Sequence, residues 1–145
     1  AALWEGLADG TIDAVTSGHR PQSSVEKMVP FARAEPGIIG LQTALSLVLE
    51  LVAGDRITLR RAIELLSVGP SGVLGRIPPA LRVGAAADLV VFDPSTLREF
   101  SAEEIVSKSK NSPFIGATLT GNVRATFVGG ALGYASPTVR REEAE

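Results

Sequence analysis

The sequence predicts an α/β protein, and three observations support that fold class. Residues 12–16 (IDAVT) are a short β-branched run typical of a buried strand, and the loop 17–22 follows at its end. Residues 41–68 carry apolar side chains at three- and four-residue spacing, which indicates amphipathic helices. Beyond residue 81, short β-branched runs separated by turn residues indicate a β-rich unit.

Two helices are expected in the middle of the chain. The first covers 40–53 and ends at Gly54-Asp55. The second covers 59–68, with Thr58 as its N-cap. We expect Gly69-Pro70 to stop this second helix, because a proline in a helix interior removes a backbone donor.

The β-rich unit is expected to contain short strands and one short helix. A strand over 89–92 should close at Asp93-Pro94, and Ser101 should begin a helix with acidic residues in its first turn. Gly121-Asn122 is interpreted as a turn. Gly129-Gly130 is predicted to join the last two strands as a two-residue hairpin.

Composition excludes several classes of function. The 145 residues carry a net charge of −2 with scattered basic residues, so neither nucleic acid nor a membrane surface is an expected partner. The chain has no cysteine, and it shows neither a signal peptide nor an apolar run of spanning length. A cytoplasmic location is the prediction.

Several motifs occur in a fixed order along the chain. They are residues 9–15 (DGTIDAV), His19 and Pro21, Lys27, residues 30–31 (PF), 35–41 (EPGIIGL), 87–94 (ADLVVFDP), 108–116 (KSKNSPFIG) and 119–126 (LTGNVRAT). In this order they resemble the dihydroorotase branch of the amidohydrolase superfamily, over roughly residues 1–134.

The resemblance implies the C-terminal part of a (β/α)₈ barrel followed by a small β-domain. Residues 1–76 would hold the last strand and C-terminal helices of the barrel, residues 77–134 the small β-rich domain with one short helix, and residues 135–145 a charged tail. A complete barrel needs about 250 residues, so a fragment of a longer chain is expected.

Three departures from the family motif bear on activity. The resemblance places the family's metal-site aspartate and general base at Gly18, and the histidine that helps hold the substrate carboxylate at Gln22. Glycine has no side chain to accept a proton, and glutamine carries no charge. The family's glutamate in the G-L-E-T motif is Gln42 here. No catalytic residue is therefore predicted within the chain.

The remaining loop residues are predicted to form a vestigial pocket loop. They are His19, Arg20, Pro36, Gly37 and Gly40. His19 is expected to make a structural hydrogen bond, since one imidazole does not make a multi-histidine zinc site. Arg20 is expected to be a surface residue, with an anion contact as the alternative. No metal site and no cofactor are predicted, because the resemblance puts the family's metal-binding H-x-H pair and bridging lysine upstream of residue 1.

Two functions follow as hypotheses. The first is a non-catalytic pseudo-dihydroorotase that supports assembly of the aspartate carbamoyltransferase catalytic chain in pyrimidine biosynthesis, in a hetero-oligomer. The second is an active zinc-dependent dihydroorotase or related cyclic amidohydrolase that takes its base from another carboxylate. Asp9 and Asp13 are the nearest carboxylates, and both are interpreted as structural residues. The first hypothesis is the prediction, which makes the chain an inactive homologue.

Overall fold

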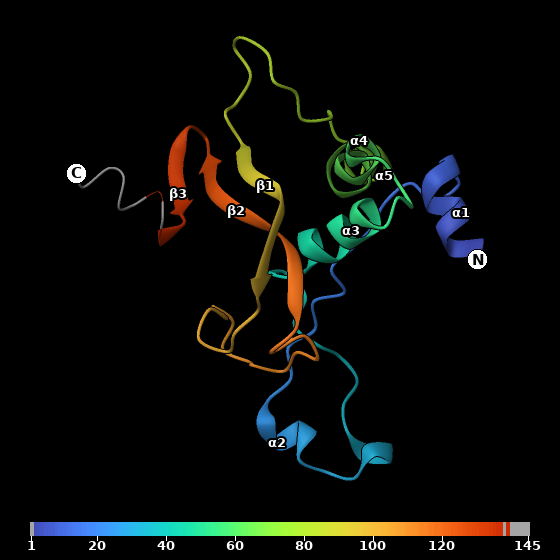
Figure 1. The fold of residues 1–145 in the computed structure, drawn as a ribbon, viewed down its shortest axis with the longest axis vertical. Coiled ribbons are helices and arrows are strands. Elements are labelled where there is room, and N and C mark those ends of the chain that lie inside the picture. Colours follow the sequence, from blue (N-terminus) through green and yellow to red (C-terminus); the bar gives the residue numbers. More distant parts are fainter. Residues whose placement is uncertain (1, 138, 140–145) are drawn as a thin grey trace.

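The computed structural model describes residues 2–137 and residue 139, so most of the predicted charged tail lies outside the described residues. In chain order the elements are α1 (Ala2–Asp9), α2 (Ser24–Lys27), the 3₁₀ helix η1 (Phe31–Arg33), α3 (Ala44–Ala53), α4 (Leu59–Ile63), the π-helix η2 (Glu64–Val68), α5 (Gly69–Val73), β1 (Leu89–Glu99), β2 (Thr118–Val128) and β3 (Ala131–Ala135). The strands form an antiparallel sheet in the order β1-β2-β3, beside a group of helices (Figure 1). The predicted α/β class is confirmed.

The two helices predicted in the middle of the chain are present. The Thr58 hydroxyl accepts a 3.1 Å hydrogen bond from the Arg61 N–H, which caps α4 as expected. Gly54 ends α3. Both helices contribute to a buried apolar cluster, whose members are Leu7, Val48, Ile57, Ala62 and Leu65. Part of each apolar stripe therefore faces this shared core, whereas Leu41 and Ile63 are exposed and Leu49 lies against β2.

The prediction that Gly69-Pro70 stops the second helix is wrong, because the chain changes its hydrogen-bond register there. The Gly69 N–H donates to the Glu64 carbonyl, five residues back, which makes η2 a π turn. α5 then continues with Pro70 in its first turn, where a missing N–H costs little. The same shift leaves the Leu65 carbonyl facing Pro70 five residues on, which has no N–H to donate.

That free carbonyl anchors the segment before the candidate loop. The Val15 N–H donates to the Leu65 carbonyl at 2.9 Å, and the Ile12 N–H donates to the Gly6 carbonyl at 2.9 Å. The predicted strand over 12–16 is not formed within the described residues. A strand exists only where a neighbouring strand pairs with its backbone, and here the partners are carbonyls of the helical elements α1 and η2.

Arg61 joins three elements through its side chain. Its guanidinium donates to the Leu7 carbonyl at 2.8 Å and to the Ile12 carbonyl at 2.6 Å. It also lies 3.5 Å from the Glu64 carboxylate, and its side chain is 19% exposed. The helix end, the extended segment and α4 are thus tied together by one planar cation.

β1 extends beyond the predicted stop at Asp93-Pro94, so that boundary is wrong. The register with β2 shifts between Asp93 and Leu97, which marks a bulge. The Asp93 carboxylate accepts from the Ser95 N–H and hydroxyl and from the Thr96 N–H at 2.8–3.1 Å. In the bulge these bonds take the place of hydrogen bonds between the strands. Pro94 is tolerated there because no inter-strand bond needs its N–H.

β2 likewise runs through the predicted turn at Gly121-Asn122. Gly121 has φ +89°, and a Cβ there would lie 2.3 Å from the Leu49 side chain of α3. The adjacent Thr120 N–H donates to the Glu50 carboxylate at 2.8 Å. The glycine therefore lets α3 lie against the middle of the strand, and the predicted turn at this position is wrong.

The Gly129-Gly130 hairpin is confirmed. Both glycines have positive φ, +56° and +84°, as a two-residue hairpin turn requires. The Gly129 N–H also donates to the Asp88 carboxylate at 2.6 Å. This turn pairs β2 with β3, which ends at the buried Ala135.

A second apolar cluster lies beneath the sheet and the connection between β1 and β2. It consists of Ile39, Phe100, Ile105 and Leu119. The short helix predicted at Ser101 is absent from the described structure. The Glu104 carboxylate instead accepts from the Ser101 N–H at 2.7 Å and lies 2.6 Å from Arg98, which holds the segment as a turn.

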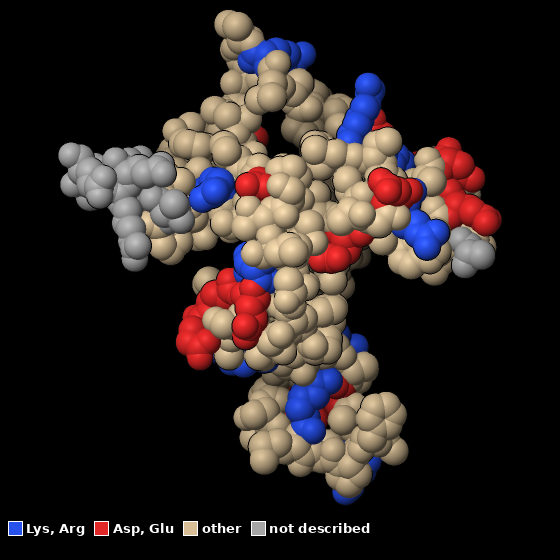
Figure 2. Space-filling view, in the orientation of Figure 1, with Lys and Arg blue, Asp and Glu red and all other residues tan. Residues whose placement is uncertain are grey.

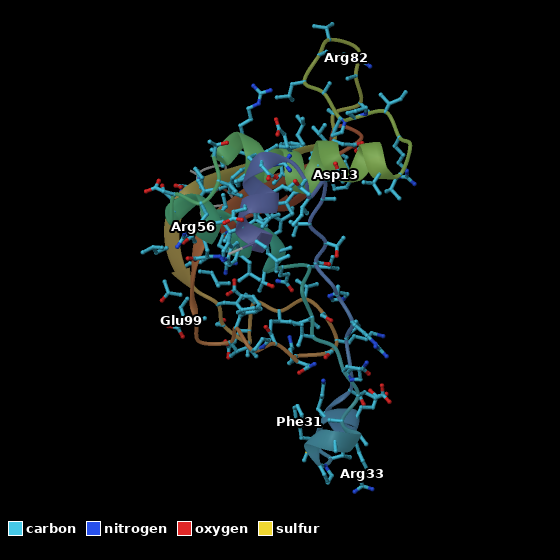
Figure 3. All side chains as sticks on the ribbon, turned by 90° about the vertical axis from the view of Figure 1, so that its right-hand side faces the viewer. Asp13, Phe31, Arg33, Arg56, Arg82 and Glu99 are labelled. Carbon is cyan, nitrogen blue, oxygen red and sulfur yellow. The ribbon has the colours of Figure 1, made fainter. Side chains whose placement is uncertain are left out.

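Two segments project from the packed part of the molecule. One carries α2 and η1, and Figure 3 shows its Phe31 and Arg33 far from the sheet and from the helices that pack beside it. The other is the connection before β1, which carries Arg82. Figure 2 shows basic and acidic side chains interspersed over the visible face. Among the helices of residues 2–137, none has the length and apolar character needed to cross a bilayer.

Candidate functional site

The candidate loop leaves and re-enters the molecule through one pair of neighbouring segments. His19 and Ile38 form a parallel bridge, and the Arg20 N–H donates to the Ile38 carbonyl at 2.8 Å. On the returning side, the Gly40 N–H donates to Nδ1 of His19 at 3.1 Å. Three of the predicted loop residues, His19, Arg20 and Gly40, are therefore brought together at the base of the loop.

The bond at Nδ1 determines what His19 can offer a ligand. An imidazole nitrogen that accepts a hydrogen bond carries no proton, so the neutral ring holds its proton on Nε2. The half-buried His19 can donate from Nε2 but cannot accept there. It lines a cavity of about 250 Å³ together with Ile39, Phe100 and Val106. The structural hydrogen bond expected for His19 is present at Nδ1, and the Nε2–H remains as a donor.

The two loop glycines are required by close backbone approach. A Cβ at Gly40 would lie 2.2 Å from the Ser17 carbonyl oxygen. A Cβ at Gly37, which has φ +129°, would lie 2.7 Å from the Arg20 carbonyl oxygen. Both segments would separate if either glycine carried a side chain.

Arg20 and Pro36 occupy the outer part of the loop base. Arg20 lies 3.7 Å from Glu35, and both side chains are more than half exposed, so this ion pair adds little stability. The Pro36 carbonyl accepts a 3.1 Å bond from the Gln22 side-chain amide. Gln22 therefore holds the two arms of the loop together.

Gly18 is an open position. It has φ +57°, and a Cβ built there meets no atom within 4 Å. Neither Asp9 nor Asp13, the nearest carboxylates in the sequence, occupies the open space beside Gly18. Asp9 accepts from the Thr11 N–H, which lowers the pKa of its carboxyl, and Asp13 lies beside Gly69 and Val73 of α5 (Figure 3).

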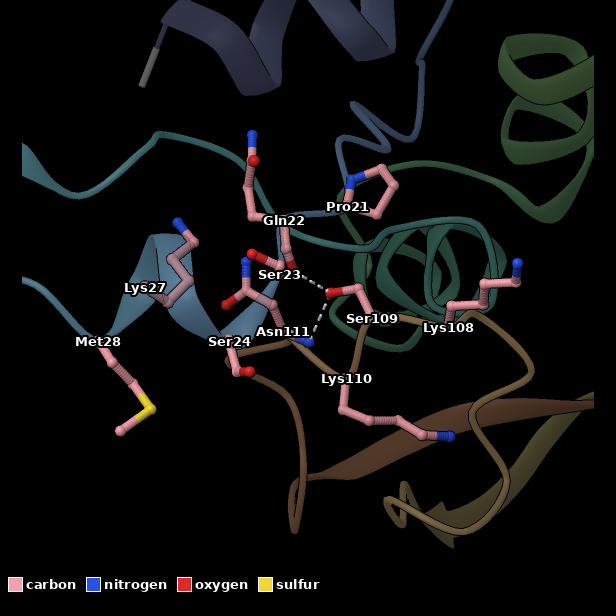
Figure 4. Close-up of a pocket in the computed structure, with 10 residues that line it drawn as sticks. All are labelled: Pro21, Gln22, Ser23, Ser24, Lys27, Met28, Lys108, Ser109, Lys110 and Asn111. Atoms are coloured by element: carbon pink, nitrogen blue, oxygen red, sulfur yellow. Dashed lines mark hydrogen bonds between the residues drawn. The ribbon is translucent and has the colours of Figure 1, made fainter.

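A hollow of about 730 Å³ lies where the outgoing arm meets residues 108–111 (Figure 4). Its lysines do not converge. Lys27 donates to the Glu35 carbonyl and Lys110 to the Ile105 carbonyl. In Figure 4 the amino group of Lys27 points away from those of Lys108 and Lys110. The hollow is an open groove without a focused anion site.

Sequence reasoning missed the contacts that hold this loop from the far end of the chain. The Ser109 hydroxyl donates to the Gln22 carbonyl and the Asn111 amide to the Gly37 carbonyl, each at 2.6 Å. The signal in the sequence is the polar run at 107–112, which does not indicate its partners.

Gln42, interpreted from sequence as a lost charge, has a structural task. Its amide nitrogen donates to the Glu104 carbonyl at 2.7 Å, and its amide oxygen accepts from the Val106 N–H at 2.8 Å. An ionised glutamate would make only the second bond. The uncharged amide therefore fits this position better than a carboxylate does.

The described residues do not form a metal site. Among residues 2–137 and 139, no three histidine, cysteine or acidic side chains gather closely enough to hold an ion. His19, with Nδ1 taken and a proton on Nε2, also has no free lone pair for a cation in its neutral form. We therefore derive no step through a metal from these residues.

Known proteins resemble this chain over almost its whole length. No protein-family model matches it. The dihydroorotase of Sulfurihydrogenibium is 43% identical over 134 residues, covering 92% of this chain and 31% of the relative. The dihydroorotase of Geotalea daltonii is 44% identical over 132 residues, covering 91% and 31%. The chain thus spans about a third of the length of these relatives.

Solved structures of two hydrolases contain a segment with a fold similar to this chain. An L-hydantoinase (dihydropyrimidinase) from Arthrobacter aurescens has a TM-score of 0.80 at 32% identity, covering 92% of this chain and 32% of the other. A dihydropyrimidinase from Brevibacillus agri has a TM-score of 0.82 at 26% identity, covering 90% and 30%.

These comparisons correct the prediction of an inactive homologue. The relatives carry the name dihydroorotase, and the structural neighbours are hydantoinases and dihydropyrimidinases. The prediction treated the departures at Gly18, Gln22 and Gln42 as the loss of a reaction. A few positions within a third of the relatives' length do not decide a site whose side chains come from several strand ends. Over this segment, the chain is related to the dihydroorotase-like amidohydrolases.

Proposed function

We propose that this chain forms one side of the substrate pocket of a dihydroorotase-type cyclic amidohydrolase. The proposal rests on a single observation: the base of the candidate loop is closed at His19, Ile38 and Gly40 within a segment 43% identical to a dihydroorotase. The names of the relatives and neighbours all refer to cyclic amides, namely dihydroorotate, hydantoin and dihydropyrimidine. A cyclic amide is therefore the proposed substrate class.

The reaction would add one water across a ring amide. The ring C–N bond breaks, the carbonyl carbon takes the hydroxyl group of the water and becomes a carboxyl group, and the nitrogen takes the remaining proton as a ureido N–H. The residues of this chain bind and orient the ring. The Nε2–H of His19 donates to a ring carbonyl oxygen, and Gly37 and Gly40 let the two loop arms lie close enough together to hold the imidazole in place.

The test is turnover of three cyclic amides by the purified protein. Dihydroorotate, hydantoin and dihydrouracil are compared, and the proposal expects ring opening of dihydroorotate with the highest kcat/KM. His19→Ala should lower kcat/KM by roughly 10- to 100-fold, the worth of one hydrogen bond to a polarised oxygen. Arg60→Ala, at a side chain 89% exposed on α4, is the control and should leave it unchanged. Turnover of none of the three would refute the proposal.

A second proposal concerns the predicted partner, the catalytic chain of aspartate carbamoyltransferase. It is supported by the resemblance and by the apolar side chains on the segment that projects with α2 and η1. Val25, Met28 and Phe31 there are 76%, 83% and 98% exposed. An assembly role of this kind does not depend on the absence of activity.

Co-purification of the two proteins tests this second proposal. Phe31→Ser should weaken the complex, whereas Val83→Ser, at an equally exposed position on the other projecting segment, should not. Equal weakening by both variants, or a monomer in the presence of the transferase, would contradict it.

A further inference from the structure

Asn111 lies at the point where the candidate loop returns to the molecule. Its side-chain amide donates to the Gly37 carbonyl at 2.6 Å, and its own carbonyl accepts from the Ile39 N–H at 2.9 Å. The first contact joins residues 74 positions apart in the chain. One residue of the β1–β2 connection therefore binds the returning arm on both sides of Ile38.

The outgoing arm is held by the same connection. The Ser109 hydroxyl donates to the Gln22 carbonyl at 2.6 Å and accepts from the Asn111 N–H at 3.2 Å. The part of the loop that projects, with α2 and η1, lies outside these contacts. Residues 109–111 therefore form hydrogen bonds with both arms at the base of the projecting segment.

The returning arm transmits the position of Asn111 to His19. Ile38 lies between the two residues that Asn111 binds, and it pairs with His19 in the parallel bridge. The next residue but one, Gly40, donates to His19 Nδ1. A shift of the Gly37–Gly40 arm would therefore turn the imidazole or break its only recorded side-chain bond within the described residues.

We propose that Asn111 is the positioning residue of the candidate site, holding the Gly37–Gly40 arm where it orients the His19 imidazole. The expected effect of Asn111 on the reaction rate rests on the proposed function. Its expected effect on the orientation of the His19 imidazole is independent of that function. Asn111 touches no substrate in this account and acts only through the backbone that it binds.

Asn111→Asp is the discriminating variant. It keeps the size and the acceptor oxygen but removes the donor to the Gly37 carbonyl, and it places a carboxylate oxygen against that carbonyl. Asn122→Asp is the matched control, because Asn122 is half-buried in β2 and no side-chain hydrogen bond is recorded for it within the described residues.

The readout uses a favourable feature of the sequence. His19 is the only histidine among the 145 residues, so its imidazole resonances are identified without ambiguity by NMR of the labelled protein. We expect Asn111→Asp to shift these resonances and to speed amide exchange at Arg20, Ile39 and Gly40 about tenfold or more. Asn122→Asp should change neither. Unchanged His19 resonances and exchange in Asn111→Asp would overturn the proposal.

Kinetics separate positioning from mere stability. At a temperature where both variants are folded, Asn111→Asp should lower kcat/KM about tenfold while Asn122→Asp does not. If His19 moves but an active protein keeps its kcat/KM, the positioning role is refuted. If the unsubstituted protein turns over no cyclic amide, the proposed function fails while the NMR result still decides the orientation of His19.

If the Asn111→Asp variant does not fold, the proposal can be tested by a measurement on the unsubstituted protein. The hydrogen bond between the Asn111 amide and the Gly37 carbonyl should give a through-bond coupling between the nitrogen and carbonyl carbon nuclei. Slow exchange of the Ile39 amide should accompany it. A missing coupling together with fast Ile39 exchange would overturn the proposal without any substitution.

Discussion

The backbone N–H of Val15 donates to the carbonyl oxygen of Leu65 at 2.9 Å, so the segment leading to the candidate loop is attached to a π turn. The turn frees that carbonyl because the Gly69 N–H reaches back to Glu64 and Pro70 has no N–H. Helix irregularities of this kind are often found near functional sites. Here the irregularity sets where the candidate loop starts.

The contact at Gly69 predicts a steric effect on stability. A Cβ at Gly69 would lie 1.9 Å from the Asp13 carbonyl oxygen, so Gly69→Ala should lower the free energy of unfolding by about 1–3 kcal/mol. Gly72→Ala is the control in the same helix, because a Cβ there meets nothing within 4 Å. It should raise stability by up to about 1 kcal/mol. Urea denaturation measures both, and equal effects of the two variants would contradict the close packing.

The neighbouring arginines on α4 should differ sharply. Arg61→Ala removes the bonds to the Leu7 and Ile12 carbonyls and should lower the free energy of unfolding by roughly 2–3 kcal/mol. Arg60→Ala removes only an exposed ion pair with Glu64 and should change it by less than about 0.5 kcal/mol. Thermal unfolding of the two variants tests this, and a loss of similar size in both would show that the buried bonds of Arg61 contribute nothing.

The open position at Gly18 predicts a gain in rate. The resemblance places the family's proton acceptor there, and the space around the Cβ position is free. Gly18→Asp should raise kcat by tenfold or more over Gly18→Asn, since a positioned general base is worth about 10²–10⁴ in rate. Both side chains tolerate a positive φ at similar cost, so the pair differs only in basicity. Equal kcat values in dihydroorotate turnover would show that this position takes no part in proton transfer.

The bulge in β1 predicts a dependence of stability on pH. The Ser95 N–H, followed by the Thr96 and Ser95 hydroxyls and the Thr96 N–H, lowers the pKa of the Asp93 carboxyl well below its ordinary value of 3.8. A carboxyl with a lowered folded pKa adds stability that is fully present above the unfolded pKa and is lost as pH falls through the folded pKa. Stability should therefore fall as the pH drops below about 3.8.

Asp93→Asn removes the titrating group from the bulge and keeps one acceptor oxygen. The urea midpoint of this variant should fall less between pH 5.5 and pH 2.5 than that of the unsubstituted protein. The other acidic groups titrate in both proteins and cancel in the comparison. Parallel curves for the two proteins would mean that the bonds to the Asp93 carboxylate do not favour its charged form.

Features with local causes were predictable from the sequence. The cap at Thr58, the end of α3 at Gly54 and the hairpin at Gly129-Gly130 depend on residues within four positions of one another. Their signals are therefore complete in a short window. The order of motifs also indicated the dihydroorotase relationship that the comparisons support.

The wrong boundaries share a different cause. Pro70 and Pro94 were expected to end their elements, yet a π turn and a bulge carry the chain past each of them. Gly121 was expected to be a turn, and its role is to admit Leu49 of α3 against the strand. The π turn and the bulge are local changes of hydrogen-bond register that the apolar pattern does not mark, and Leu49 lies in an element far from Gly121 in the sequence.

By itself, the sequence indicated where α3, the start of α4 and the last hairpin lie, which residues enter the candidate loop, and which enzymes the chain resembles. The tertiary structure alone decided how that loop is held, through Asn111 acting on Gly37 across 74 positions and Gln42 bridging two backbone groups of the β1–β2 connection. The physical reason is that helix caps and tight turns are satisfied by near neighbours. A backbone carbonyl in a loop instead takes whichever donor the packed fold brings within reach.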